Sequence, residues 1–292
     1  MKYFVLFNPL AGNGNAIKKS QTISVDSETV YLDVTKIEDY TSLFSSLDSD
    51  DKIIICGGDG TLNRFINATE NIDLKNDILY VAAGSGNDFI KDIGQENADK
   101  PIKVNDYINN LPIITVNGRD YRFINGIGFG IDGYCCEERD RKQAKNNKPV
   151  NYTLIALKGL LFAYKPRNAT VIIDGKEYKY KKVWMAPTML GRYFGGGMMV
   201  TPQQDRNNPD GMVTSFIAHD LSKALIVYFF PLIFKGKHTN KTKYVAIKRG
   251  YDIKVAFDKP CALQIDGETV TNVSEYSVKA SKTEKELLTS DI

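Results

Sequence analysis

A glycine-rich turn that contains an aspartate follows an apolar run early in the chain. Residues 52–61 read KIIICGGDGT. Three glycines in four positions remove side chains from one face of the turn, so its backbone N–H groups can approach phosphate oxygens. A carboxylate at Asp59 is useful there if it holds a divalent cation or orients an attacking hydroxyl. Thr61 either binds a phosphate or caps the following helix. The turn indicates phosphate chemistry, and the alternative is a plain turn with Asp59 as a cap.

Two further glycine-rich turns follow other apolar runs. Residues 8–14, NPLAGNG, come after YFVLF, and residues 83–89, AGSGNDF, come at the end of ILYVAA. The first lacks the lysine of a Walker loop, and alone it is equally consistent with an ordinary strand-to-helix turn. The second places Ser85 before an Asn–Asp pair that either caps a helix or brings Asp88 to the site. Three such turns at successive strand ends favour a common phosphate site.

A parallel sheet would bring these turns together. In the first hundred residues, short apolar runs alternate with helix-like stretches, which is typical of an α/β layer. Ligands of such sheets bind at the carboxyl ends of the strands. Later in the chain, Asn117-Gly118 and Asp174-Gly175 lie between alternating strand candidates and predict hairpins.

We therefore expect two domains. Residues 1–101 form an α/β nucleotide-binding domain, and residues 102–282 form a β-rich sandwich domain for the substrate. The tail, residues 283–292, is either a helix that packs back on the first domain or a disordered end.

Composition narrows the function classes. The formal net charge is only +3, and no run of Lys and Arg argues for nucleic acid, whereas an anionic small molecule or a membrane surface stays open. Four cysteines and two histidines do not have the spacing of a disulfide framework or a zinc site. The N-terminus is typical of a first strand rather than a signal peptide. The longest apolar run, residues 224–234, is too short for the roughly 20 residues of a spanning helix. We expect a cytoplasmic protein.

The order of motifs along the chain resembles that of a known family. NPxAG at residues 8–12, GGDGTxN at 57–63 and GxGNDF at 84–89 are followed by FGGGM at 194–198, by Asp210-Gly211, and by QIDGE at 264–268. This series is similar to that of the diacylglycerol kinase catalytic family, which comprises bacterial lipid kinases related to sphingosine kinases and, more distantly, to NAD kinase. The resemblance covers nearly the whole chain. GGDGT alone would not separate these relatives, but the later motifs do.

The resemblance implies a fold and a set of catalytic residues. The fold is an α/β nucleotide domain like that of NAD kinase and 6-phosphofructokinase, followed by a β-sandwich domain, with ATP and Mg²⁺ between them. Glu268 would be the general base, and Asp59 and Asp266 would also be catalytic. The implied ATP-binding residues are Asn8, Pro9, Leu10, Ala11, Gly12, Thr35, Gly57, Gly58, Asp59, Gly60, Thr61, Leu62, Asn63 and Ser85.

The resemblance also implies two metal sites. Asp59 and Asp88 would organise the catalytic Mg²⁺. A structural Mg²⁺ would be held by the Asp210 carboxylate and by the carbonyls of Asn207 and Met212. One departure from the family concerns position 64, where Arg64 stands in place of the usual Glu.

The expected function is that of an ATP-dependent lipid kinase that phosphorylates a lipid hydroxyl, with diacylglycerol or a related lipid as substrate. The alternatives are an NAD kinase, or a nucleotide-sensing or membrane-binding module that has lost catalysis, which Arg64 keeps open. The residues QIDGE are alternatively a type I′ hairpin turn with an exposed acid.

The expected partner is a lipid at a membrane surface, which the protein visits reversibly through exposed apolar and basic residues. No nucleic acid is expected, and a homodimer is left open. Trp184 and residues 228–230, YFF, are expected in the core. The basic cluster 235–243, KGKHTNKTK, is a solvated loop or a contact to anionic headgroups.

Overall fold

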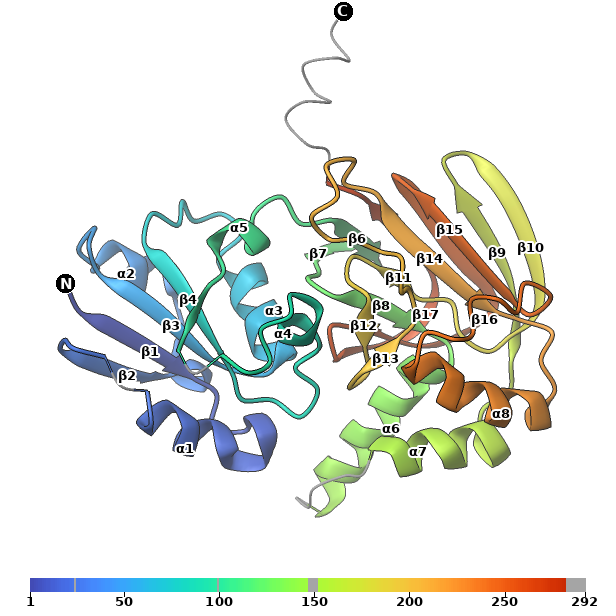
Figure 1. The fold of residues 1–292 in the computed structure, drawn as a ribbon, viewed down its shortest axis with the longest axis horizontal. Helices are drawn as coiled ribbons and strands as arrows, with labels where there is room; N and C mark the ends of the chain where they lie inside the picture. The colour runs from blue at the N-terminus through green and yellow to red at the C-terminus, as the bar shows by residue number, and fades with distance from the viewer. Residues whose placement is uncertain (24, 99, 147–151, 282–292) are drawn as a thin grey trace, which may run out of the picture. The chain divides into compact units, whose positions relative to one another are not determined.

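The computed structural model describes residues 1–23, 25–98, 100–146 and 152–281 (Figure 1). It divides into two compact units, Met1–Asn109 and the chain from Asn110 onward. The predicted tail, residues 283–292, lies outside the described residues. Within the described part of the chain, every helix is too short or too polar to span a bilayer.

The first unit is a five-stranded sheet flanked by helices, in the order β2-β1-β3-β4-β5. The first four strands are parallel, and β5 pairs antiparallel with β4. The strands are β1 (Tyr3–Phe7), β2 (Thr29–Asp33), β3 (Lys52–Gly57), β4 (Asp77–Ala82) and β5 (Ile102–Lys103). The helical segments are η1 (Ala11–Gly14), α1 (Asn15–Gln21), η2 (Val34–Lys36), α2 (Tyr40–Ser45), α3 (Asp59–Ala68), α4 (Asp88–Asp92) and α5 (Asn105–Ile108).

The central strands of this sheet are apolar and buried, which is why they form the middle of an α/β layer. Ile53, Ile54 and Ile55 of β3 are all fully buried, as expected for a central parallel strand covered on both faces. The strand order changes direction at β1, because β2 and β3 lie on its two sides. Such a switch point opens a crevice at the carboxyl ends of the strands. The unit extends to Asn109 rather than ending at residue 101, because β5 pairs with β4 and α5 follows it directly.

The second unit is built on a ten-stranded antiparallel sheet. Its main path runs β15-β14-β11-β8-β16-β17-β6-β7, and the β9–β10 hairpin branches from β16. Its strands are β6 (Ile113–Val116), β7 (Arg119–Arg122), β8 (Gly126–Phe129), β9 (Arg167–Ile173), β10 (Lys176–Val183), β11 (Thr188–Met189), β14 (Val213–Ala218), β15 (Val245–Gly250), β16 (Asp252–Ile265) and β17 (Glu268–Lys279). A separate small hairpin is formed by β12 (Tyr193–Phe194) and β13 (Met198–Met199).

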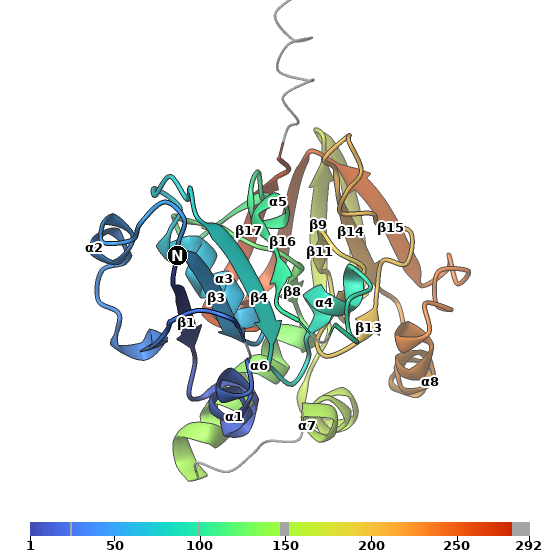
Figure 2. The same ribbon diagram turned by 60° about the vertical axis from the view of Figure 1, so that its left-hand side comes forward.

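One long strand joins two parts of this sheet. The first half of β16 pairs with β9, whereas its last residues pair with β8, as the turned view also shows (Figure 2). The predicted hairpins are confirmed: Asn117-Gly118 joins β6 to β7 and Asp174-Gly175 joins β9 to β10, with positive φ at all four residues. This left-handed conformation is the one that a two-residue type I′ turn requires.

Helices pack on the second unit in addition to its strands. They are α6 (Ile131–Asn146), α7 (Tyr152–Lys158), the π-helical turn η3 (Gly159–Ala163) and α8 (Lys223–Phe234). Their buried side chains, with those of β12, β13 and β14, form one apolar cluster around Trp184, Phe216 and Phe229. The expected core positions of Trp184 and Phe229 are therefore confirmed, but Tyr228 is 61% exposed, so its assignment to the core is wrong.

Candidate active site

Hydrogen bonds join the three glycine-rich turns of the first unit. The Asn8 amide Nδ2 donates to Thr61 Oγ1 at 3.1 Å, which ties the turn after β1 to the turn after β3. The Ala83 N–H donates to the Gly57 carbonyl at 2.7 Å, which ties the latter to the turn after β4. The predicted convergence at one edge of the sheet is thus seen in the structure. The hydroxyl of Thr61 is therefore already engaged, because it accepts this hydrogen bond from Asn8.

The Asp59 carboxylate connects the second turn to helix α4. Its Oδ2 accepts the Asp88 N–H at 2.9 Å, and its Oδ1 accepts the Phe89 N–H at 3.0 Å. Asp59 therefore caps α4, which was the alternative to a role at phosphates. An ionised carboxylate only accepts, and carboxylate oxygens are also the ligands that hard cations take, so capping and metal binding are compatible roles for this side chain. Asp88, which is buried, supplies a second carboxylate in the same turn region. This oxygen donor set fits Mg²⁺.

The glycines have a packing role that the sequence did not reveal. A Cβ on Gly84 would lie 2.5 Å from Gly58 Cα, and a Cβ on Gly58 would lie 3.0 Å from Gly84 Cα. The two backbones therefore touch, and no side chain fits between them. A Cβ on Gly57 would lie 2.5 Å from the Thr61 side chain. Substitution at Gly58 would consequently test turn packing rather than phosphate binding.

The remaining residues expected at ATP differ in exposure. Leu10 and Ser85 are exposed, and Thr35 is exposed in η2, where its N–H and Oγ1 both donate to Asp33 Oδ1. Leu62 and Asn63 are buried on the inner side of α3. Leu62 therefore supports the helix from the core, and its side chain is not in a position to contact a nucleotide.

Another acidic group of the first unit lies at the opposite edge of the sheet. Among the described residues, ligand atoms of Asp48, Asp50 and Asp51 come within metal-binding distance of one another. Asp50 pairs with the N-terminal amino group at 2.8 Å, and Asp51 accepts the Lys2 N–H at 2.7 Å. The group thus lies before β3, at the amino ends of the strands, away from the glycine-rich turns.

In the second unit, the QIDGE motif forms the hairpin between β16 and β17. Ile265 pairs with Glu268 across a two-residue turn, and Asp266 and Gly267 have φ of 45° and 93°. The type I′ turn is therefore present, but Asp266 is not an exposed acid. It is buried, and its carboxylate accepts the N–H groups of Ile124, Asn125 and Gly126 at 2.6, 2.8 and 2.9 Å. These bonds make Asp266 an anchor of the hairpin. Glu268 lies half-buried at the start of β17.

A buried aspartate that sequence reasoning missed lies behind this hairpin. Gln264 Oε1 accepts the Gly267 N–H at 2.5 Å, and Gln264 Nε2 donates to Asp132 Oδ2 at 2.8 Å. Asp132 is in the first turn of α6 and is 3% exposed. A Cβ on Gly128 would lie 1.6 Å from Asp132 Oδ2, so glycine is required there. The signal available in the sequence was an acid within the apolar run GIGFGID.

The same Asp132 lines an apolar pocket of the second unit. The FGGGM motif borders this pocket through Gly195 and Met198, and Gly195, Gly196 and Gly197 all have positive φ, which favours glycine. The walls come from α6, α7, η3 and α8, and the lining residues are Ile131, Asp132, Cys135, Ala156, Leu160, Met185, Gly195, Met198, Ile226, Phe230, Ile233 and Phe234. The cavity between these apolar side chains is small, about 40 Å³, and its one acid is hydrogen-bonded to Gln264 of the motif that carries Glu268.

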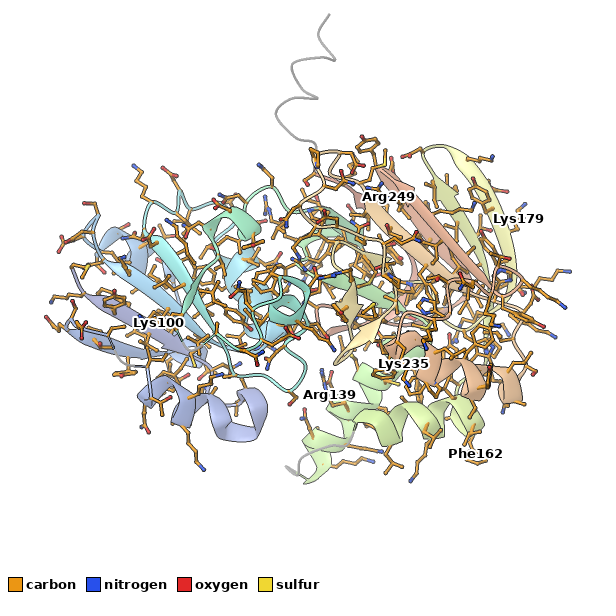
Figure 3. The ribbon with its side chains drawn as sticks, in the orientation of Figure 1. Lys100, Arg139, Phe162, Lys179, Lys235 and Arg249 are labelled. Atoms are coloured by element: carbon orange, nitrogen blue, oxygen red, sulfur yellow. The ribbon has the colours of Figure 1, made fainter. Side chains whose placement is uncertain are left out.

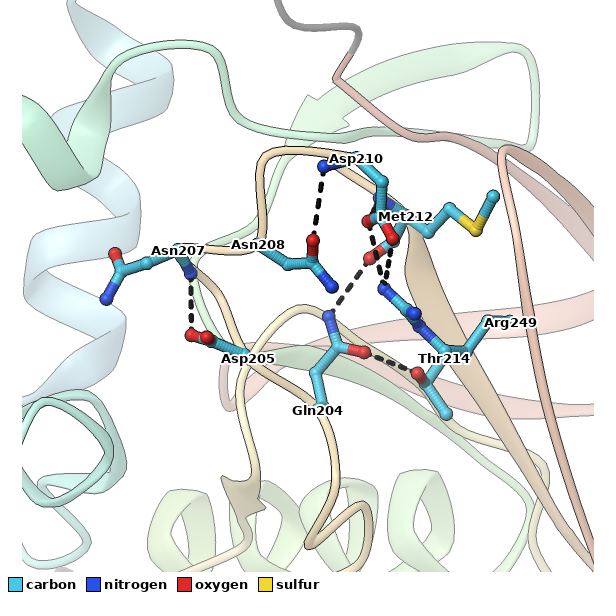
Figure 4. Close-up of polar contacts among 8 residues, drawn as sticks. All are labelled: Gln204, Asp205, Asn207, Asn208, Asp210, Met212, Thr214 and Arg249. Atoms are coloured by element: carbon cyan, nitrogen blue, oxygen red, sulfur yellow. Dashed lines mark hydrogen bonds and ion pairs between the residues drawn. The ribbon is translucent and has the colours of Figure 1, made fainter.

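The loop expected to hold a structural Mg²⁺ does not fit a metal (Figure 4). Nη2 of Arg249 donates to both oxygens of the Asp210 carboxylate, at 2.9 and 2.8 Å. Gln204 Nε2 donates to the Met212 carbonyl at 3.0 Å, and Gln204 also bonds Thr214 Oγ1. Two of the three expected ligand groups are thus engaged by protein donors. A guanidinium on the carboxylate would also repel a cation, so this expectation is corrected: Arg249 supplies the positive charge.

We expect Arg249→Met to lower the melting temperature of the protein by about 2–4 °C. A partly exposed ion pair contributes at most about 1 kcal/mol, and this converts to such a shift in a chain of this size. EDTA should not lower the melting temperature of the parent protein without nucleotide. The matched control is Lys254→Met, which breaks the exposed Lys254–Glu275 pair of the same sheet. If thermal denaturation shows that EDTA lowers the melting temperature as much as Arg249→Met does, the loop holds a metal after all.

Comparison with known proteins identifies the family. A model described as the diacylglycerol kinase catalytic domain matches residues 2–113, and one described as the YegS C-terminal NAD kinase beta sandwich-like domain matches residues 125–281, more than half of the chain. The chain belongs to the diacylglycerol kinase family. The family resemblance and the expected fold class are thereby confirmed, and kinase membership supports a phosphotransferase.

Individual relatives in this family are distant. A diacylglycerol kinase of Mycobacterium tuberculosis is 25% identical over 251 residues, covering 81% of this chain and 79% of the relative. A diacylglycerol kinase of Bacillus subtilis is 23% identical over 277 residues, with 90% and 88% covered. A crystal structure of a diacylglycerol kinase from Bacillus anthracis has a TM-score of 0.59 at 15% identity, covering 96% of this chain and 94% of that one. This structural likeness supports the fold alone.

Proposed function

We propose that the protein is an ATP-dependent lipid kinase that transfers the γ-phosphate of ATP to a hydroxyl of diacylglycerol or a related lipid. The match to the diacylglycerol kinase catalytic domain over residues 2–113 carries the lipid assignment. An acyl chain also needs apolar walls, which the pocket of the second unit has, although its cavity of about 40 Å³ must widen to admit one. Its acid, Asp132, is linked through Gln264 to the turn that bears Glu268. The relatives named diacylglycerol kinase support the same substrate class.

The first unit supplies nucleotide binding in this proposal. Backbone N–H groups of the turns after β1 and β3 receive the ATP phosphates, and the glycine contact between residues 58 and 84 keeps that backbone free of side chains. Asp59 and Asp88 would hold Mg²⁺, with Asp59 oriented by its two bonds to α4. When bound, Mg²⁺ neutralises charge on the phosphates during transfer.

The second unit supplies the proton acceptor. As the lipid hydroxyl oxygen bonds to the γ-phosphorus, its proton passes to a carboxylate oxygen of Glu268, and the bond from the γ-phosphorus to the bridging oxygen of ADP breaks. Asp266 has a positioning role, since its three backbone bonds fix the turn on which Glu268 is carried. Gln264 fixes the same turn from the pocket side.

We expect Ala156→Phe, which fills the pocket from α7, to discriminate between lipids by chain length. Displacing about two or three methylenes from apolar walls costs about 2 kcal/mol, so kcat/KM for long-chain diacylglycerol should fall by about 30-fold. The value for a short-chain analogue and the KM for ATP should change little. Ala224→Phe, at an exposed position of α8, is the control for added aromatic bulk outside the pocket. Equal losses for both lipids in a mixed-micelle kinase assay would remove the pocket from substrate binding.

A further inference from the structure

Two stretches of the second unit contain no acidic residue. Asp and Glu are absent from residues 141–173 and again from residues 221–251, although the chain as a whole has 35 acidic residues. Both stretches contain lysines. The first stretch includes α7 and η3, and the second includes α8 and the basic cluster 235–243. The structure therefore collects positive charge on these helices, beyond what the small net charge of the chain indicates.

Large apolar side chains are exposed on the same helices. Among the described residues of the second unit, every exposed large hydrophobic side chain belongs to α7, η3 or α8. The most exposed are Phe162, at 78%, and Tyr228, at 61%, and the others are Leu154, Leu157 and Phe234. A contiguous set of such residues on a soluble surface marks a site of interaction.

Helix α8 is apolar on both of its sides. Ile226, Phe229 and Ile233 are buried toward the core, as the spacing of a helix that packs on a sheet requires. The outward positions carry Tyr228, Pro231 and Phe234, where an ordinary surface helix has polar residues. Between Lys223 and Lys235 the helix has no charged residue at all. The lysines thus flank an apolar outer side.

The exposed helices adjoin each other. Lys223 Nζ, at the start of α8, donates to the Leu161 carbonyl of η3 at 2.8 Å. Leu160 of η3 and Ile226 of α8 are walls of the same apolar pocket. Figure 3 labels Phe162 and Lys235 on this helical side of the unit, away from Lys179 on β10. We call this surface the α7–α8 face, defined by Leu154, Leu157, Phe162, Tyr228 and Phe234 with Lys158, Lys165, Lys223 and Lys235.

We propose that the α7–α8 face docks the protein reversibly on a bilayer that contains anionic phospholipids. Phe162 and Tyr228 insert at the boundary between headgroups and acyl chains, as the aromatic residues of interfacial helices do. The lysines contact headgroup phosphates, and the lack of Asp and Glu removes the repulsion that these phosphates would otherwise meet. The inference rests on the proposed function in one respect, because the lipid that enters the pocket between these helices would come from the same bilayer.

Vesicle sedimentation with the full chain tests this docking. Phosphatidylcholine vesicles with and without phosphatidylglycerol are compared at low and high salt. We expect binding only to the anionic vesicles, weakened by salt. The double substitution of Phe162→Ser with Tyr228→Ser should lower the partition coefficient at least about ten-fold, since two aromatic side chains lose their apolar contact. Lys158→Glu with Lys235→Glu should lower it about 25-fold or more, from about five-fold for each lost lysine contact.

Matched controls lie elsewhere on the surface. Tyr31→Ser on β2 removes an exposed aromatic residue, and Lys179→Glu on β10 reverses an exposed charge, without touching the α7–α8 face. Both should bind vesicles like the parent protein, and circular dichroism melting checks that every variant is folded. Face variants that bind as tightly as the parent overturn the proposal. A second outcome also overturns it: the parent protein binds no vesicle but forms a dimer, and the face variants are monomeric.

A parallel kinase assay in detergent micelles separates the docking proposal from the proposed function. Lipid phosphorylation in micelles without vesicle binding overturns the docking face and leaves the kinase in place. Vesicle binding that is lost in the face variants, in a protein that phosphorylates no lipid, supports the face and overturns the proposed function.

Discussion

Glu268→Gln lowers the turnover number by about 10²- to 10⁴-fold, the range that a general base contributes. Gln has nearly the shape of Glu and cannot accept the proton of the lipid hydroxyl. The turn that holds residue 268 is fixed by Asp266 and Gln264, so the substitution leaves it intact. ATP affinity should therefore stay unchanged in calorimetry, while steady-state and single-turnover rates fall together.

Glu275→Gln is the matched control for this experiment. Glu275 lies on the same strand, β17, where it forms an exposed ion pair with Lys254. It should turn over like the parent enzyme. A Glu268→Gln enzyme with near-parent turnover, when chemistry limits the rate, would leave the QIDGE motif as a hairpin turn without a catalytic acid.

Asp59→Asn lowers turnover by about 10²- to 10³-fold, as removal of one preorganised electrostatic group does. It also raises the Mg²⁺ concentration needed for half-maximal rate, because one anionic ligand is lost. A structural loss accompanies this effect. An Asn side chain presents one acceptor oxygen and one NH₂ to the N–H groups of Asp88 and Phe89, so one of the two caps on α4 is broken.

Asn87→Gly separates the two effects. Asn87 Oδ1 accepts the Gly84 N–H at 2.9 Å, and residue 87 has φ of 53°, which glycine adopts readily. This variant loosens the same turn and leaves the Asp59 carboxylate in place. Both variants should melt at lower temperature, but only Asp59→Asn should shift the Mg²⁺ titration of the rate. If Asp59→Asn and the parent need the same Mg²⁺ concentration for half-maximal rate, Asp59 caps α4 and is not a metal ligand.

Local patterns predicted the parts of the fold that depend on neighbours in sequence. Asn117-Gly118 and Asp174-Gly175 specify hairpin turns by themselves, because both residues of each pair tolerate positive φ. The alternation of strands and helices likewise predicted the α/β layer. The meeting of three turns followed from a general property of parallel sheets. The domain limit shifted to Asn109 because a two-residue strand, β5, has too little pattern to read.

Contacts between residues far apart in the chain could not be predicted from local sequence patterns. Asp132 meets Gln264 across 132 positions, and Asp210 meets Arg249 across 39, so no local spacing reveals either pair. The contact between Gly58 and Gly84 is of the same kind: Gly58 was predicted to bind phosphate, although close backbone packing against Gly84 already requires a glycine there. Exposure of Tyr228 depends on which side of α8 faces the sheet, and a helix that is apolar all round gives no such signal.

Transfer of label from γ-³²P-ATP is the most direct test of a lipid kinase with this architecture. Purified protein is incubated with Mg²⁺, labelled ATP and, separately, micellar diacylglycerol, other hydroxyl-bearing lipids, and NAD. We expect a labelled, organic-soluble lipid phosphate whose formation needs both ATP and lipid and is lost in Glu268→Gln. Labelled NADP without any labelled lipid, or ATP binding without transfer to any acceptor in the panel, would contradict it.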